Sequence, residues 1–150
     1  MIYVFWAVLI LLTFLIQGSI SFLHIKLNLT VILVCYIGIR KGEIKGMLFG
    51  ALIGILEDSL SGIFIGPNLL SKGIIGYLSS SLSRRIFIWT PFLGVINIFF
   101  LTFLDCTIIF ILRSVFDKMP VSLGTALFIL LIKSMVNAPL GIFLKPKDVL

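Results

Sequence analysis

Long stretches without charged side chains are the feature that most limits what this chain can fold into. The first of them, residues 2–23, is uncharged throughout, and as an α-helix it would extend about 33 Å at 1.5 Å per residue, enough to cross a bilayer. Five further apolar runs follow, separated by short polar or basic segments. We therefore expect an all-α integral membrane protein, a compact bundle of about six transmembrane helices at residues 2–23, 25–39, 46–65, 68–83, 90–112 and 121–144.

The composition agrees with this interpretation. Hydrophobic residues make up 60% of the chain and charged residues 12%, whereas a soluble domain has about 45–50% apolar and about 25% charged residues. Because the six runs occupy almost all of the 150 residues, we expect residues 1–150 to form a single polytopic membrane domain. The net charge of +6 comes from short basic clusters between the apolar runs, which favours contact with the bilayer surface and not with nucleic acid.

Two of the runs have features that predict irregular helices. The run at 25–39 is short for a span, so it must thin the bilayer or lie partly within protein. The run at 121–144 contains Asn137 and Pro139. Because proline lacks a backbone N–H, a kink is expected there, and a neighbouring group must satisfy the carbonyl groups that it frees.

The basic residues also predict the orientation. If the loops after the first, third and fifth helices lie outside, the inner side receives seven Lys or Arg residues and the outer side three. The positive-inside rule then places both termini in the cytoplasm. The seven inner residues are Arg40, Lys41, Lys45, Arg84, Arg85, Lys145 and Lys147, and the three outer ones are Lys26, Arg113 and Lys118.

Glycines recur in a four-residue register along the third run. A step of four keeps them on one slowly drifting helix face, where the missing side chains let another backbone approach closely. The sequence leaves open whether this face packs within the same chain or against another protein. The predicted packing positions are Gly46, Gly50, Gly54, Asp58, Gly62 and Gly66.

Several polar side chains fall inside the predicted spans. An ion in the hydrocarbon costs roughly 2.5–3.5 kcal/mol on insertion scales, so each needs a partner. Depth counting along the helices suggests that Asp58 pairs with Lys72 and that Asp105 lies near the reach of Lys133. We interpret these groups as fixing helix registry or docking a partner, with an ion path as the less favoured alternative. The intramembrane polar set is Glu57, Asp58, Lys72, Asp105, Lys133 and Asn137.

Catalytic and metal-binding signatures were sought along the whole sequence. The single histidine, His24, lies near a predicted helix end, and Cys35 and Cys106 fall inside apolar runs without metal-ligand spacing. No nucleophile–base, zinc or nucleotide-binding motif is present. We therefore expect no enzymatic activity, no cofactor and no metal.

The stretch Gly50–Leu78, GALIGILEDSLSGIFIGPNLLSKGIIGYL, resembles the bacterial rod shape-determining membrane protein family MreD. Asp58, Gly62, Gly66, Gly76 and Tyr77 fall on the family pattern. The run ending near Tyr36, Asp105 and the Asn137-Ala138-Pro139 stretch are also similar to it, so the likeness covers nearly the whole chain.

The resemblance implies a non-enzymatic scaffold of the cell-elongation machinery in the bacterial inner membrane. Its implied partner is the bitopic protein MreC and, through that protein, MreB filaments, RodA and a class B penicillin-binding protein, in a role that sets rod shape and peptidoglycan synthesis. It also implies a fold similar to the substrate-binding subunits of energy-coupling-factor transporters. The alternative is therefore a subunit that binds a vitamin-like molecule, against which the short outer loops and the single alanine of the first helix, Ala7, both argue.

Overall fold

The computed structural model describes residues 8, 10–16, 21–22, 25–26, 28–62, 64–85, 90–116 and 122–144. Within these residues the fold is almost entirely helical, with helical residues 10–16 at the start, which we call the N-terminal helical segment. A two-residue antiparallel pair, β1 (Ser21–Phe22) and β2 (Ile25–Lys26), comes before the longer helices. These are α2 (Leu29–Lys41), α3 (Glu43–Ser61), α4 (Pro67–Arg85), α5 (Pro91–Phe116), α6 (Leu123–Asn137) and the 3-10 helix η1 (Ala138–Phe143).

The short helix α2 supplies much of the core. At 13 residues it extends only about 20 Å, and it packs against α3, α4 and α5. Val31, Val34 and Cys35 are fully buried and belong to the main hydrophobic cluster, with Ile75 and Ile98 from the helices around them. Because most of the surface of α2 packs against other helices, its length need not match the bilayer.

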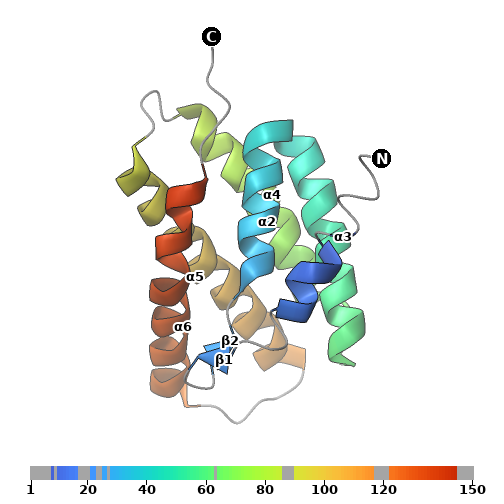
Figure 1. Ribbon diagram of the computed structural model, residues 1–150. Coiled ribbons are helices and arrows are strands. Elements are labelled where there is room, and N and C mark those ends of the chain that lie inside the picture. The colour runs from blue at the N-terminus through green and yellow to red at the C-terminus, as the bar shows by residue number, and fades with distance from the viewer. Residues whose placement is uncertain are drawn as a thin grey trace.

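Helices α3 and α4 form a closely packed antiparallel hairpin (Figure 1). An added Cβ at Gly46 would lie 2.5 Å from the backbone oxygen of Gly76, and one at Gly50 would lie 2.7 Å from the backbone carbon of Lys72. Gly54 meets the backbone of Asn68 in the same way. The predicted glycine face is therefore already occupied by a helix of the same chain.

Gly62 and Gly66 have a different role from the one that their register suggests. Both have positive φ, 64° at Gly62 and 153° at Gly66, conformations that L side chains disfavour. Gly62 caps α3 in the left-handed region, and an added Cβ there would meet nothing within 4 Å. These two glycines shape the turn between the helices and are not part of the packing face.

The second half of the fold is built from α5, α6 and η1. Helix α5 begins at Pro91, and the backbone N–H of Leu93 donates to the Thr90 hydroxyl at 3.3 Å, as the Thr90-Pro91 pair predicts. At Ala138, one residue before Pro139, the α-helical pattern of α6 gives way to η1. In the described part of the chain, Pro91–Phe116 and Gly124–Phe143 are the two helical stretches long and apolar enough to cross a membrane.

Helix ends differ from the apolar runs at several places. The run predicted at 2–23 includes β1, and the run predicted at 25–39 includes β2, so α2 begins at Leu29. Asn28 stands at its start, held by side chains of other helices. In the third run, the left-handed Gly62 ends α3 at Ser61, four residues before the predicted end.

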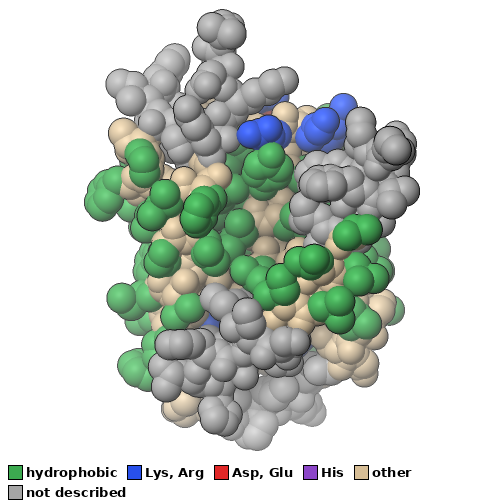
Figure 2. Space-filling view, viewed as in Figure 1, with side chains coloured by type: hydrophobic (Ala, Val, Ile, Leu, Met, Phe, Trp, Pro, Cys, Tyr) green, Lys and Arg blue, Asp and Glu red, His purple; other side chains and the backbone are tan. Residues whose placement is uncertain are grey.

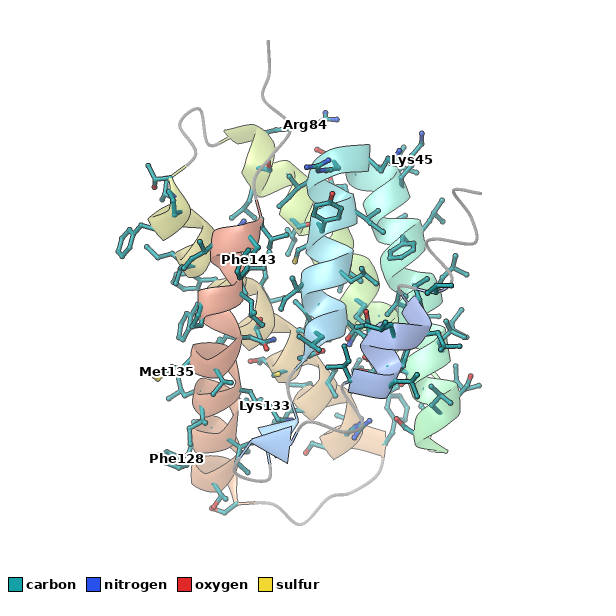
Figure 3. All side chains as sticks on the ribbon, viewed as in Figure 1. Lys45, Arg84, Phe128, Lys133, Met135 and Phe143 are labelled. Atoms are coloured by element: carbon teal, nitrogen blue, oxygen red, sulfur yellow. The ribbon has the colours of Figure 1, made fainter. Side chains whose placement is uncertain are left out.

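The outer surface divides into an apolar flank and a basic end. Figure 2 shows hydrophobic side chains over the flank and Lys or Arg side chains at the upper end. Lys45 and Arg84 lie at that end (Figure 3), together with Arg40 and Lys41 at the end of α2. Basic residues therefore gather at one end of the bundle, where α2 ends, α3 begins and α4 ends.

Candidate functional site

Lys72 of α4 lies at the centre of a buried ion-pair network. Its Nζ is 2.5 Å from Oε2 of Glu57 in α3 and 3.8 Å from Oδ2 of Asp105 in α5. Lys72 and Asp105 are fully buried, and Glu57 is 8% exposed. One lysine thus joins carboxylates from two neighbouring helices.

Neutral side chains complete the coordination of both carboxylates. The Thr30 hydroxyl lies 2.5 Å from Oε1 of Glu57 and 2.9 Å from Oδ1 of Asn28, two acceptors for its single proton. Asp105 accepts from Asn28 Nδ2 at 2.6 Å and from the Ser71 hydroxyl at 2.5 Å. Charges removed from water are tolerated when their remaining lone pairs are hydrogen-bonded, which is the arrangement here.

Asn137 extends the network to the end of α6, where η1 begins. Its Nδ2 donates to the backbone oxygen of Asn28 at 3.0 Å. Through Asn28 and its partners, the network connects the start of α2, the last turns of α3, the first turns of α4, the middle of α5 and the end of α6. A shift of any of these helices breaks at least one buried polar contact.

Asp58 does not pair with Lys72, contrary to the expectation from depth counting. Its carboxylate accepts from the backbone N–H groups of Gly66 at 2.9 Å, Asn68 at 3.2 Å and Leu69 at 3.2 Å. Asn68 Nδ2 adds a fourth hydrogen bond at 2.7 Å. A carboxylate at a helix N-terminus satisfies free N–H groups and interacts favourably with the helix dipole, so Asp58 caps α4 from the preceding helix.

Lys133 also lies apart from its expected partner. Asp105 is about 16 Å from the Phe116 end of α5, and Lys133 is about 15 Å from the Leu123 end of α6, so their depths are similar. The sequence had placed Lys133 deeper because α5 was expected to end at residue 112. Asp105 nevertheless takes Lys72 as its cation, and no described carboxylate lies within 4 Å of the Lys133 ammonium.

A cavity of about 630 Å³ adjoins this network. It lies where α3 ends and α4 begins, opposite the basic end that carries Lys45 and Arg84. The short outer loops of the sequence argued against a ligand pocket, but the walls of this cavity are formed by the helices and not by loops. Its lining residues are Phe14, Asn28, Glu57, Leu60, Ser61, Asn68, Lys72, Cys106, Ile109, Phe110, Arg113, Ser114, Ala126, Ile129, Leu130 and Lys133.

Periodic positions on two helices face this cavity. On α5 they are Cys106, Ile109, Phe110 and Arg113, and on α6 they include Lys133. Such spacing of three and four residues marks one helix face. Lys133 lies on the side of α6 toward the rest of the bundle, whereas Phe128 and Met135 lie on the opposite side (Figure 3).

A second, apolar groove of about 390 Å³ runs along the flank. The N-terminal helical segment and η1 form its sides, and the exposed edge of α2 forms its floor. Its lining residues are Thr13, Ile16, Leu29, Ile32, Leu33, Tyr36, Leu140, Phe143 and Leu144. Near the basic end, the Arg40 guanidinium lies 4.8 Å from the centre of the Tyr36 ring.

The described parts of the chain hold two free cysteines and no cluster of metal ligands. Across those residues, no group of three or more His, Cys, Asp or Glu side chains could hold a metal ion. Cys35 and Cys106 are free and buried. His24 lies outside the described residues.

Sequence reasoning missed the neutral members of the network. Asn28, Thr30, Ser71 and Asn68 were not among the predicted site residues, although each carries a hydrogen bond to a buried charge or its partner. The available signal was two polar residues, Asn28 and Thr30, at the start of an otherwise apolar run. Polar side chains inside a membrane protein face the bundle interior, so they indicate where it needs hydrogen bonds.

The comparisons with known proteins identify the family. The family model described as "rod shape-determining protein MreD" matches residues 1–145, nearly the full length of 150 residues. No curated protein and no solved structure matches the chain. The chain belongs to the MreD family of rod shape-determining proteins and is therefore a membrane protein with a role in determining cell shape.

Proposed function

We propose that this protein is a non-enzymatic scaffold of the cell-elongation machinery in the bacterial inner membrane, which binds the transmembrane helix of an MreC-like bitopic partner. The family match over residues 1–145 is the observation that carries this proposal. Through that partner it would act indirectly with MreB, RodA and a class B penicillin-binding protein in setting rod shape and peptidoglycan synthesis.

The interior suits a scaffold because it is held together by specific contacts. Backbone packing at Gly46, Gly50 and Gly54 joins α3 to α4, and the network around Lys72 joins α4 to α3 and α5. Buried polar contacts of this kind favour one arrangement of helices over others. A rigid bundle can present a fixed surface to a partner helix.

Because α4 already covers the glycine face of α3, we propose that the partner helix docks in the flank groove instead. That groove is lined almost wholly by apolar side chains, among them Ile32, Leu140 and Phe143. Two or three large apolar side chains of a transmembrane helix would fill its 390 Å³. Packing of this kind, and not the hydrophobic effect, drives helix association in lipid.

The proposal includes the orientation of the protein in the membrane. Residues 1–150 would form one membrane domain with both termini in the cytoplasm, and the end that carries Lys45 and Arg84 would face inward. A single-span partner with a cytoplasmic N-terminus could then lie along the flank through the whole bilayer. Its extracytoplasmic part would emerge at the end where the polar cavity lies.

Co-purification of an MreC-like partner tests the groove. We expect an Ile32→Trp substitution, which fills the groove, to reduce recovery of the partner at least tenfold, because the docking side chains lose their space. Phe128→Trp is the matched control, since Phe128 is 65% exposed and lies outside the groove. Undiminished recovery with Ile32→Trp would exclude the groove, and no recovery with the unmodified chain would exclude the scaffold function.

The cavity is the one observation that favours the alternative, a subunit that binds a vitamin-like molecule for a transporter. Its volume lies in the range of small-molecule sites, about 300–1,000 Å³. Uptake of such a molecule that depends on this chain would support the alternative. The scaffold is preferred because the family match implies a role in shape determination.

A further inference from the structure

The cavity walls carry more positive than negative charge. Among the lining residues are three cations, Lys72, Arg113 and Lys133, and one carboxylate, Glu57. Lys72 is already shared between Glu57 and Asp105. Arg113 and Lys133 are therefore the two lining cations that have no carboxylate in contact among the described residues.

Neither of these two side chains has an ionic partner among the described residues. No described carboxylate lies within 4 Å of either cation, and Arg113 Nε is buried without a hydrogen-bond partner. Both side chains are half-buried in the cavity wall. A cation withdrawn from water gains from a counter-ion, and an unpaired buried N–H donor costs about 1–3 kcal/mol.

The two cations lie at different depths. Arg113 is about 4 Å from the Phe116 end of α5, whereas Lys133 is about 15 Å from the Leu123 end of α6. Arg113 is therefore nearer that end of the bundle, and Lys133 lies further inside. Apolar side chains, including Leu60, Ile109 and Ile129, line the wall between them.

We propose that this cavity binds a phosphate-bearing anion, with Arg113 and Lys133 as the cationic ligands and the apolar wall in contact with the rest of the molecule. Guanidinium groups bind phosphate oxygens through paired N–H donors, and a lysine ammonium attracts anionic oxygens as a point charge. Basic pockets between transmembrane helices hold anionic lipid headgroups at the cytoplasmic face by this chemistry, and this cavity would hold such a group at the opposite end. Either a lipid headgroup or a soluble phosphate compound provides such an anion.

Binding measurements on the purified full chain test the proposal without any partner protein. The probes are dioctanoyl phosphatidylglycerol, zwitterionic dioctanoyl phosphatidylcholine and inorganic phosphate, titrated by calorimetry in a neutral detergent. We expect the unmodified chain to bind phosphatidylglycerol at least tenfold more tightly than phosphatidylcholine. Arg113→Gln and Lys133→Gln should each weaken that binding about tenfold, as loss of one charge-assisted contact predicts.

Three further variants separate the site from effects on folding. Arg84→Gln removes a cation at the opposite end and should leave binding unchanged. Arg113→Lys keeps the charge but not the paired donors, so it should bind more tightly than Arg113→Gln, a difference that a general folding defect would not produce. Ile129→Trp fills the cavity without changing its charge and should weaken binding as much as Arg113→Gln does.

Each result of these binding measurements either supports or overturns the proposed phosphate site. Competition by inorganic phosphate at similar affinity would assign the site to a soluble phosphate compound, and its failure to compete would assign the site to a lipid. The proposal would be overturned if the chain bound the two lipids equally well and did not bind inorganic phosphate. It would also be overturned if the affinity for phosphatidylglycerol were unchanged in Arg113→Gln, Lys133→Gln and Ile129→Trp. None of these results depends on whether the flank groove binds an MreC-like helix.

Discussion

Replacing Lys72 with methionine removes the cation that both Glu57 and Asp105 contact, and it tests whether the ion-pair network holds the bundle together. Lys72 is fully buried, with its Nζ at 2.5 Å and 3.8 Å from the two carboxylates. Methionine has a similar volume, so the substitution changes mainly the charge. Breaking a buried pair by removing one partner costs about 3–5 kcal/mol.

A loss of that size is a large fraction of the total stability. Folded domains have free energies of unfolding of about 5–15 kcal/mol. We therefore expect Lys72→Met to lower the free energy of unfolding by about 3–5 kcal/mol, measured by SDS titration in mixed dodecylmaltoside micelles. Lys45→Met is the control, since Lys45 is exposed, and surface changes stay within about 0.5 kcal/mol.

A charge-neutral version of the network separates electrostatics from packing. Combining Lys72→Met with Glu57→Gln and Asp105→Asn removes all three charges but keeps oxygen acceptors for Thr30 and Ser71. We expect the triple variant to recover most of the lost stability, because no unpaired ion remains. A loss under about 1 kcal/mol in Lys72→Met alone, or a triple variant as unstable as Lys72→Met, would refute the reasoning.

Three further predictions concern the hairpin and the orientation. Gly50→Ala should lower the free energy of unfolding by about 1–3 kcal/mol because the added Cβ meets the backbone of α4, whereas Gly73→Ala, with only contacts of 3.8 Å or more, should not destabilise the protein. Asp58→Ala should cost about 2 kcal/mol through loss of the cap on α4, measured by the same titration. Lys45→Cys should resist an impermeant maleimide applied to intact cells and react in inverted vesicles.

A specific result would contradict each of these three predictions. Equal stability of the two glycine variants would mean that α3 and α4 do not approach as closely as described. An unchanged free energy of unfolding in Asp58→Ala would show that water or another group caps α4 equally well. Labelling of Lys45→Cys from outside would reverse the proposed orientation.

Much of the helical arrangement could be predicted from the apolar runs, but the helix ends could not. Hydropathy does not reveal where a backbone turns, and α3 ends where Gly62 takes up a left-handed conformation. Likewise α2 begins at Leu29 because Asn28 is held by Asp105 and Asn137, which are 77 and 109 residues away in the chain. Contacts of that range leave no trace in local patterning.

For the buried charges, the need for an ionic partner could be predicted from the sequence, but the identity of that partner could not. That Lys72 needs a carboxylate could be predicted from the cost of an ion in hydrocarbon. Choosing between Glu57 and Asp58 could not, since adjacent residues on a helix differ little in depth but point about 100° apart. The choice is made by Thr30 beside Glu57 and by the free N–H groups of α4 beside Asp58.

The glycine register shows that a packing surface can be predicted from the sequence when its partner cannot. Its spacing predicts a face that accepts another backbone, but not which backbone. Only the fold reveals that α4 fills it, through its own Gly76 and the backbone carbonyl groups of Lys72 and Asn68. The flank groove and the polar cavity, assembled from helices distant in sequence, had no local signal at all.

The position of Lys72 also bears on how the chain enters the membrane during synthesis. Glu57 is translated before its cation exists, so α3 alone would carry two carboxylates, Glu57 and Asp58, into lipid. Once α4 follows, Lys72 pairs with Glu57, and backbone N–H groups at the start of α4 donate hydrogen bonds to Asp58. We therefore expect the insertion machinery to retain α3 until α4 has emerged and to release the two as one unit, ready to receive Asp105 when α5 arrives.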